Sequence, residues 1–164
     1  MKFVKSFVCG ALAALSVSAG ALAGDFTVDI AGTRFQVWTG YRIAAGTAAG
    51  ELPEGVLGFW GSDSVVYPAA APDPVPGKGI AFVRVPQSVF GGVLKNAVYV
   101  RCRTQENCIP DELAPQAEKM SRKGYRVIVD SFAGWQDAVR LLSTAPGVRE
   151  WNPDIDYNTR AEVQ

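Results

Sequence analysis

Hydrophobic and polar residues alternate over residues 25–38 in two successive runs. Alternation with a period of two is typical of a β-strand that buries one of its faces. Ala31 and Gly32 lie between the runs and suit a tight turn. The pattern therefore predicts an N-terminal β-hairpin, whose apolar faces are formed by Phe26, Val28, Ile30, Phe35 and Val37.

Short apolar runs farther along the chain predict strands, most of them buried. They cover residues 65–67, 80–85, 97–102, 125–129 and 148–151. Residues 68–79 hold four prolines and two glycines. The interior of a strand or helix does not tolerate that composition, so we expect a loop there.

Two longer segments have the pattern of a helix. Residues 111–123 begin with Asp111 as the expected N-cap and have Pro115 in the expected first turn. Residues 134–145 place apolar side chains at the spacing of one helical face. These side chains are Trp135, Ala138, Val139 and Leu142. A shorter helix is expected over residues 52–59, with Pro53 near its start.

From residue 65 onward, strands and helices follow one another along the chain. This order predicts β-α-β units and a mostly parallel sheet flanked by helices, an α/β fold to which the N-terminal β-hairpin is added. Ligands of such sheets bind in loops at the carboxyl ends of the strands. Here one such loop begins at Cys102, and a second covers residues 130–134.

The composition excludes several classes of protein, of partner and of catalytic site. The chain has 164 residues, of which 48% are hydrophobic and 20% charged, which excludes disorder and collagen. Its 16 basic and 16 acidic residues balance, so the net charge gives no case for nucleic acid or an anionic membrane surface as partner. The chain has no histidine, which removes Ser-His-Asp and Cys-His nucleophile systems. We expect neither a cofactor nor a metal site.

Residues 1–23 have the pattern of a cleaved secretory signal peptide. Lys2 and Lys5 precede an apolar stretch over residues 7–17, and Ala21 and Ala23 form a small-residue cleavage site. We therefore expect a bacterial protein that is periplasmic or secreted and has no membrane anchor after cleavage. The mature chain would retain two cysteines, Cys102 and Cys108. An even pair in an exported protein is typical of a disulfide.

Cys102 ends a predicted buried strand and opens a polar loop before a predicted helix. A thiol beside a helix N-terminus and successive backbone N–H groups has a lowered pKa, and the same groups can hold an anion. Arg103 could add positive charge to that site. The position therefore suits a nucleophile even without histidine.

Three motifs in this region resemble the rhodanese-like family. They are AVYVRC at residues 97–102, LAPQAEKMSRKGYRVIV at 113–129 and SFAGWQDAV at 131–139. The resemblance extends over roughly residues 50–145. It implies a rhodanese-like domain over residues 46–147, after a hairpin segment at 24–45 and before a C-terminal strand and polar tail at 148–164.

The same resemblance implies sulfur transfer or thiol–disulfide exchange at Cys102. Cys108 would be the resolving thiol, and Arg103 would stabilise the anion. The residues expected to line the substrate pocket are Thr104, Gln105, Glu106, Asn107, Ser131 and Trp135. The loop departs from the family pattern, because Glu106 adds a negative charge where an anion would sit.

A second, shorter resemblance concerns YRVIVDSFAGWQDAVRLL at residues 125–142, which is similar to the first strand and helix of a SPOR domain. That family binds peptidoglycan. We rank it below the first resemblance, because the residues after Gly147 are too few for the strands and helix that such a domain still needs.

Two interpretations of the cysteine pair stay open from sequence. In one, Cys102 and Cys108 are redox-active, and the protein is a sulfurtransferase or thiol–disulfide redox protein that acts on a small sulfur-containing anion. In the other, they form a structural disulfide, and the protein is a non-catalytic module that binds another envelope protein.

Overall fold

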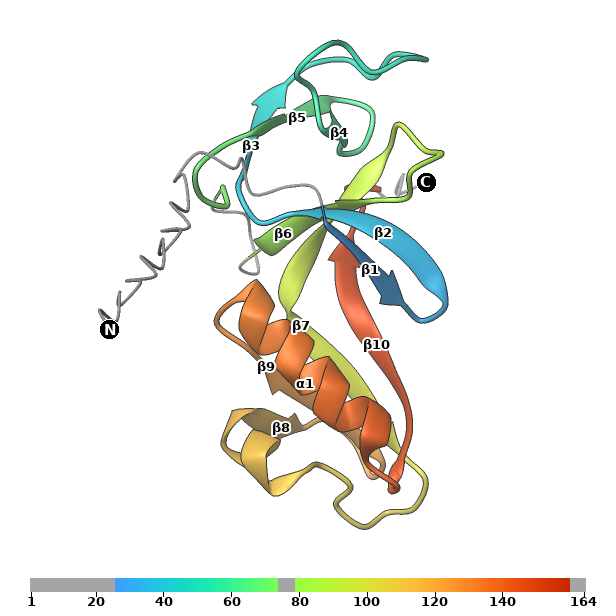
Figure 1. Ribbon diagram of the computed structural model, residues 1–164. Helices are drawn as coiled ribbons and strands as arrows, with labels where there is room; N and C mark the ends of the chain where they lie inside the picture. The colour runs from blue at the N-terminus through green and yellow to red at the C-terminus, as the bar shows by residue number, and fades with distance from the viewer. Residues whose placement is uncertain (1–25, 74–78, 160–164) are drawn as a thin grey trace, which may run out of the picture.

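The computed structural model describes residues 26–73 and 79–159 (Figure 1). The expected signal peptide and part of the expected proline-rich loop lie outside these ranges. Within them, no helix is both long enough and apolar enough to cross a bilayer.

The main sheet is antiparallel throughout, with the strand order β1-β2-β6-β7-β9-β8 and with β10 paired to β7. Its strands are β1 (Phe26–Ile30), β2 (Thr33–Trp38), β6 (Gly79–Arg84), β7 (Gly91–Cys102), β8 (Ala117–Lys119), β9 (Gly124–Ile128) and β10 (Val148–Asp156). The predicted hairpin is present as β1 and β2, and it turns at Ala31 and Gly32. The predicted fold class, a mostly parallel rhodanese-like sheet flanked by helices, is wrong.

The physical reason lies in the long strand β7. One edge of β7 pairs with β6 over its first half and with β9 over its second half, while the other edge pairs with β10. Strands β9 and β10 run in the same direction, joined by α1 (Phe132–Thr144), as a β-α-β unit requires. However, β7 lies between them and runs the opposite way, so every neighbouring pair is antiparallel.

The predicted helix over residues 111–123 is also wrong. A 3₁₀ helix, η1 (Asp111–Gln116), is followed directly by β8. Its N-cap is Pro110 rather than Asp111, and Pro115 falls beyond the N-cap and the first three helical positions, whose N–H groups need no partner within the helix. An α-helix there would lose a hydrogen bond and force the proline ring against the preceding turn. Without this helix, no crossover makes β7 and β9 parallel.

The short helix expected over residues 52–59 is wrong for a similar reason. Val56 N–H donates to the Pro53 carbonyl in a single turn, and Gly55 has φ +77°, which ends any helical path. Gly58 and Phe59 instead form the short strand β4 (Gly58–Phe59).

A second sheet of three strands covers one end of the main sheet, as the top of Figure 1 shows. Its strand order is β3-β5-β4. The central strand β5 (Ser64–Pro68) therefore pairs antiparallel with β3 (Tyr41–Ala45) on one edge and with β4 on the other. A small apolar core joins the two sheets, and it consists of Trp38, Tyr41, Val66, Phe82 and Val93.

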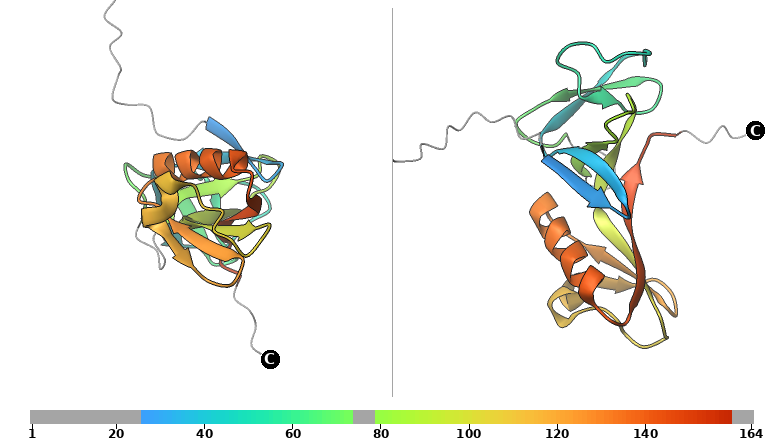
Figure 2. Two further views of the ribbon diagram at one scale, coloured as in Figure 1. Left: turned by 90° about the horizontal axis from the view of Figure 1, so that it is seen from below. Right: turned by 45° about the vertical axis from the view of Figure 1, so that its right-hand side comes forward.

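Helix α1 covers one face of the main sheet at the other end of β7 (Figures 1 and 2). Trp135, Ala138 and Leu142 are buried on its inner side, as the helical spacing predicts. They pack with β7 and β9 residues such as Val98 and Val127 into the larger core. The molecule is thus elongated along β7, with a different covering layer at each end.

Candidate functional site

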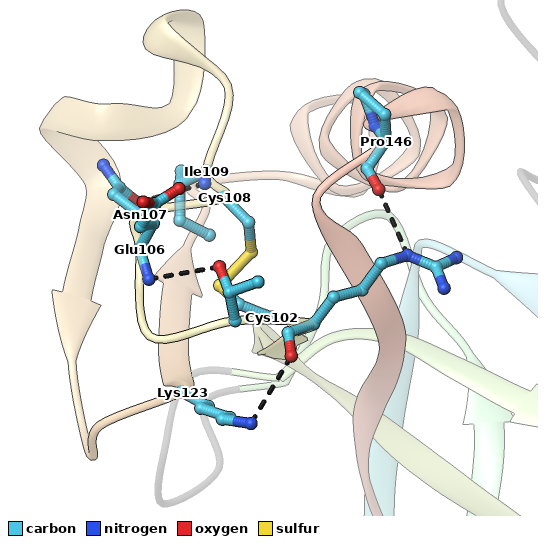
Figure 3. Close-up of a disulfide and its surroundings, with 9 residues drawn as sticks. Cys102, Glu106, Asn107, Cys108, Ile109, Lys123 and Pro146 are labelled. Carbon is cyan, nitrogen blue, oxygen red and sulfur yellow. Dashed lines mark hydrogen bonds between the residues drawn. A yellow bond between two sulfur atoms is a disulfide. The ribbon is translucent and has the colours of Figure 1, made fainter.

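The predicted disulfide is present between Cys102 and Cys108, whose Cα atoms lie 5.6 Å apart (Figure 3). Cys102 ends β7 on the side that faces the larger core and is 1% exposed. Cys108 is half-buried and packs against the same core. The bond therefore ties the loop after β7 to the interior of the molecule.

Three backbone N–H groups of this segment already have acceptors within the chain. Arg103 N–H donates to the Gly147 carbonyl at 2.9 Å, and Glu106 N–H donates to Thr104 Oγ1 at 3.3 Å. Asn107 Oδ1 accepts from Ile109 N–H at 3.0 Å. These two N–H groups, Arg103 and Glu106, are therefore not free to hold an anion above the sulfur atoms. The α-helix whose N-terminus would complete such a site is replaced by η1.

The predicted site residues of the loop lie at the surface. Arg103, Thr104, Gln105, Glu106 and Asn107 are all exposed. The Arg103 Nε donates to the Pro146 carbonyl at 3.1 Å, which directs its guanidinium toward the turn before β10 (Figure 3). The loop thus presents polar side chains to solvent around a buried sulfur.

Ser131 and Trp135 do not join these residues. Ser131 is the N-cap of α1, where its Oγ accepts from Gly134 N–H at 3.1 Å. The disulfide packs near the opposite end of this 13-residue helix, about 20 Å away. Trp135 is buried in the larger core, stacked on Phe132 and edge-on to Trp151. The structure therefore brings together the loop residues but neither of these two.

A hollow of about 570 Å³ lies at the opposite end of β7. Phe90 and Tyr157 line it and are 47% and 43% exposed, although both are large and apolar. The remaining lining comes from the loop before β5, the start of β7 and the chain after β10. Those residues are Gly61, Ser62, Asp63, Gly91, Asn158 and Thr159.

Hydrogen bonds hold the two walls of this hollow together. Trp60 Nε1 donates to the Asp156 carbonyl at 2.7 Å, and Asn158 Nδ2 donates to the Trp60 carbonyl at 3.1 Å. Asn158 N–H also donates to Asp156 Oδ1 at 2.8 Å. Because these bonds fix the chain after β10, the exposed Tyr157 ring is held in place rather than left on a loose tail.

Two consecutive glycines, Gly91 and Gly92, lie beside the hollow, and Gly91 lines it. A Cβ atom on Gly92 would lie 3.0 Å from the Tyr157 ring and would collide with Ile155. The absence of a side chain therefore lets the ring lie on the β7 backbone. Partial burial there raises the pKa of the Tyr157 hydroxyl above its ordinary value.

Sequence reasoning missed this hollow. Its aromatic residues come from the β6–β7 connection and from the segment after β10, which was expected to be a loose tail. The Gly91-Gly92 pair was the available signal, because adjacent glycines in an otherwise apolar strand mark a close approach of another group.

Among the described residues, no cluster of three or more potential ligands could hold a metal ion. No protein-family model, curated protein or solved structure matches the chain. The function is therefore argued from this chain's own geometry.

Proposed function

We propose that the protein is an exported, non-catalytic binding module in which the Cys102–Cys108 disulfide is structural. The observation that supports this most is the state of the loop after β7. Cys102 is buried, and the N–H groups of Arg103 and Glu106 already donate to acceptors within the chain. A sulfur-transfer site needs the reverse, an accessible thiolate facing free donors.

The hollow beside Phe90 and Tyr157 supports the binding half of the proposal. Ligand and partner sites combine apolar or aromatic surface with a few fixed polar groups, and aromatic residues dominate binding energy at interfaces. Here the two exposed rings are combined with Asp63 and Asn158 on a hydrogen-bonded frame. Another envelope protein is the partner class that we favour.

The redox behaviour of the disulfide tests the proposal. We expect a reduction potential below about −300 mV, as for structural disulfides, and transfer of sulfur from thiosulfate to cyanide at the background rate. The double variant Cys102→Ser/Cys108→Ser should lose about 2 kcal/mol of stability, because a short loop in the unfolded chain is no longer closed.

A bond that glutathione reduces readily, together with thiosulfate sulfurtransferase activity that Cys102→Ser abolishes, would replace this proposal with the thiol enzyme. The variant Thr47→Ala serves as the matched control for both measurements, because it changes an exposed hydroxyl that lies far from the disulfide and outside the hollow.

A further inference from the structure

Four basic residues from two separate segments lie at the end of β7 that carries the disulfide. Arg101 and Arg103 flank Cys102, and Arg122 and Lys123 lie in the turn between β8 and β9. Cys102 N–H donates to the Lys123 carbonyl at 2.8 Å, and Lys123 Nζ donates to the Arg103 carbonyl at 3.4 Å (Figure 3). We call the loop at residues 101–105 and the turn at 120–123 the basic tip.

The positive charge of the basic tip is only partly neutralised. Arg101 lies 3.5 Å from Glu150, in an exposed ion pair. Exposed ion pairs of this kind contribute little to stability, and salt screens them. Within the described residues, Arg122 has neither a hydrogen bond nor an ion pair. A surface hollow of about 530 Å³ is lined by Arg101, Arg122 and Lys123, together with Gln105, Ser121 and Gly124, and no carboxylate lines it.

Carboxylates also lie near this end, because Glu106 follows in the same loop, Glu118 lies 4.0 Å from Arg126, and Asp111 and Glu112 are exposed on η1. At the far end of the molecule, the loops around β3 and β5 carry Glu51, Glu54, Asp63 and Asp73, against Arg42. Among the described residues the far loops are therefore net negative, whereas the hollow at the basic tip is lined by cations and by no carboxylate. An anionic surface would attract the basic tip and orient the molecule with that tip forward.

A large apolar side chain projects from the same turn. Met120 is 60% exposed and has Lys119 before it and Arg122 two residues after it. An exposed apolar residue among cations matches a membrane interface, where the apolar group enters the boundary of the acyl chains and the cations contact lipid phosphates. Charge alone would suit any polyanion, but Met120 favours the lipid surface.

The tip is also preorganised. The disulfide fixes one of its segments, and the Met120 N–H and Ser121 N–H groups both donate to the Gly124 carbonyl and so close the other. Docking would therefore require little ordering of backbone.

We propose that the basic tip docks the protein onto an anionic membrane surface, with Met120 entering the interface and Arg101, Arg122 and Lys123 facing lipid phosphates. This docking is separate from the proposed binding function, since it uses neither the redox chemistry of the cysteines nor the hollow beside Tyr157.

Cosedimentation with vesicles tests the proposal. The purified protein should bind vesicles of phosphatidylcholine with about one third phosphatidylglycerol, and should bind pure phosphatidylcholine vesicles far more weakly. Each basic residue near an anionic surface contributes about fivefold to binding, so Arg122→Ala/Lys123→Ala should weaken it about 25-fold. Met120→Ser should weaken it severalfold even in low salt, because the loss is apolar.

The matched control is Arg34→Ala/Arg42→Ala, which removes the same charge from the hairpin and from β3 and should leave vesicle binding unchanged. All variants should keep the melting temperature of the parent within a few degrees, since the substituted side chains are exposed.

Several results would overturn the proposal. They are equal binding to neutral and anionic vesicles, no vesicle binding in 50 mM salt, or equal losses in the tip and control variants. Binding of soluble polyphosphate without binding of vesicles would also overturn it and would assign the tip to a soluble polyanion. None of these results bears on the reduction potential of the disulfide, so the two proposals fail separately.

Discussion

Tyr41 lies between the two sheets, with its ring tilted against Phe82 at a centroid distance of 6.2 Å. Its hydroxyl is buried and has no hydrogen-bond partner among the described residues. Burial, and secondarily the negative charge of Asp73, raises the pKa of this hydroxyl to about 12. A tyrosine in the unfolded chain ionises near pH 10, so the folded state resists losing this proton.

This difference predicts a stability loss at alkaline pH. Below pH 10 the hydroxyl is neutral in both states and has no effect. Between pH 10 and about 12 only the unfolded chain ionises at Tyr41, so unfolding becomes progressively more favourable. The variant Tyr41→Phe should be at least as stable as the parent at pH 7 and should unfold less readily in this pH window. Urea titrations at pH 8, 10 and 11 measure this, and identical pH profiles for the two proteins would contradict it.

At the scale of elements, α1 depends on the cap at its first turn. Ser131 has extended backbone and accepts from Gly134 N–H, as an N-cap does. The first turn of the helix has no acidic residue to support the same N–H groups. The serine that sequence reasoning assigned to a substrate pocket therefore has a structural contact that accounts for it.

We expect Ser131→Ala to lower the free energy of unfolding by about 1 kcal/mol, because a helix N–H group loses its acceptor. Equilibrium urea unfolding followed by circular dichroism measures the loss. Ser131→Asp should restore most of the stability, since aspartate caps equally well. A variant Ser131→Ala as stable as the parent would show that the cap contributes nothing.

The sequence allowed local elements to be predicted where one periodicity dominates. Helix α1 was predicted because its apolar residues follow the spacing of one helical face. Strand β9 was predicted because its residues form a short apolar run. Two prolines mark where the predicted bounds differ from the observed ones. Pro115 was assigned to a first helical turn that starts one residue too late. Pro153 lies inside β10, beyond the strand expected over residues 148–151, and an edge strand tolerates it because no N–H group is needed on the free side.

At the scale of the whole molecule, pairing could not be read from the sequence. The β-α-β order of β9, α1 and β10 is correct, but no local pattern shows that β7 inserts between the two strands. The hollow was missed for the same reason, because Phe90 and Tyr157 are distant in the chain. The disulfide was predicted because cysteine pairing needs only composition and compartment.

Because β10 covers a whole edge of β7, removing it should abolish the fold. A chain that ends at Gly147 would expose that edge and part of the core around Leu94 and Val98. We expect it to bind the dye ANS and to show no cooperative thermal transition, whereas the full chain melts cooperatively. A sharp transition in the truncated chain would contradict the central role of β10.

The position of β10 has a consequence for the order of events in the cell. Strand β7 spans about 37 Å between the hollow and the basic tip, and its second edge stays unpaired until residues 148–156 have been synthesised. The chain must therefore be synthesised through β10 before this edge of β7 can close. For the exported protein that we propose, this delay would leave the chain unfolded while the export machinery engages it.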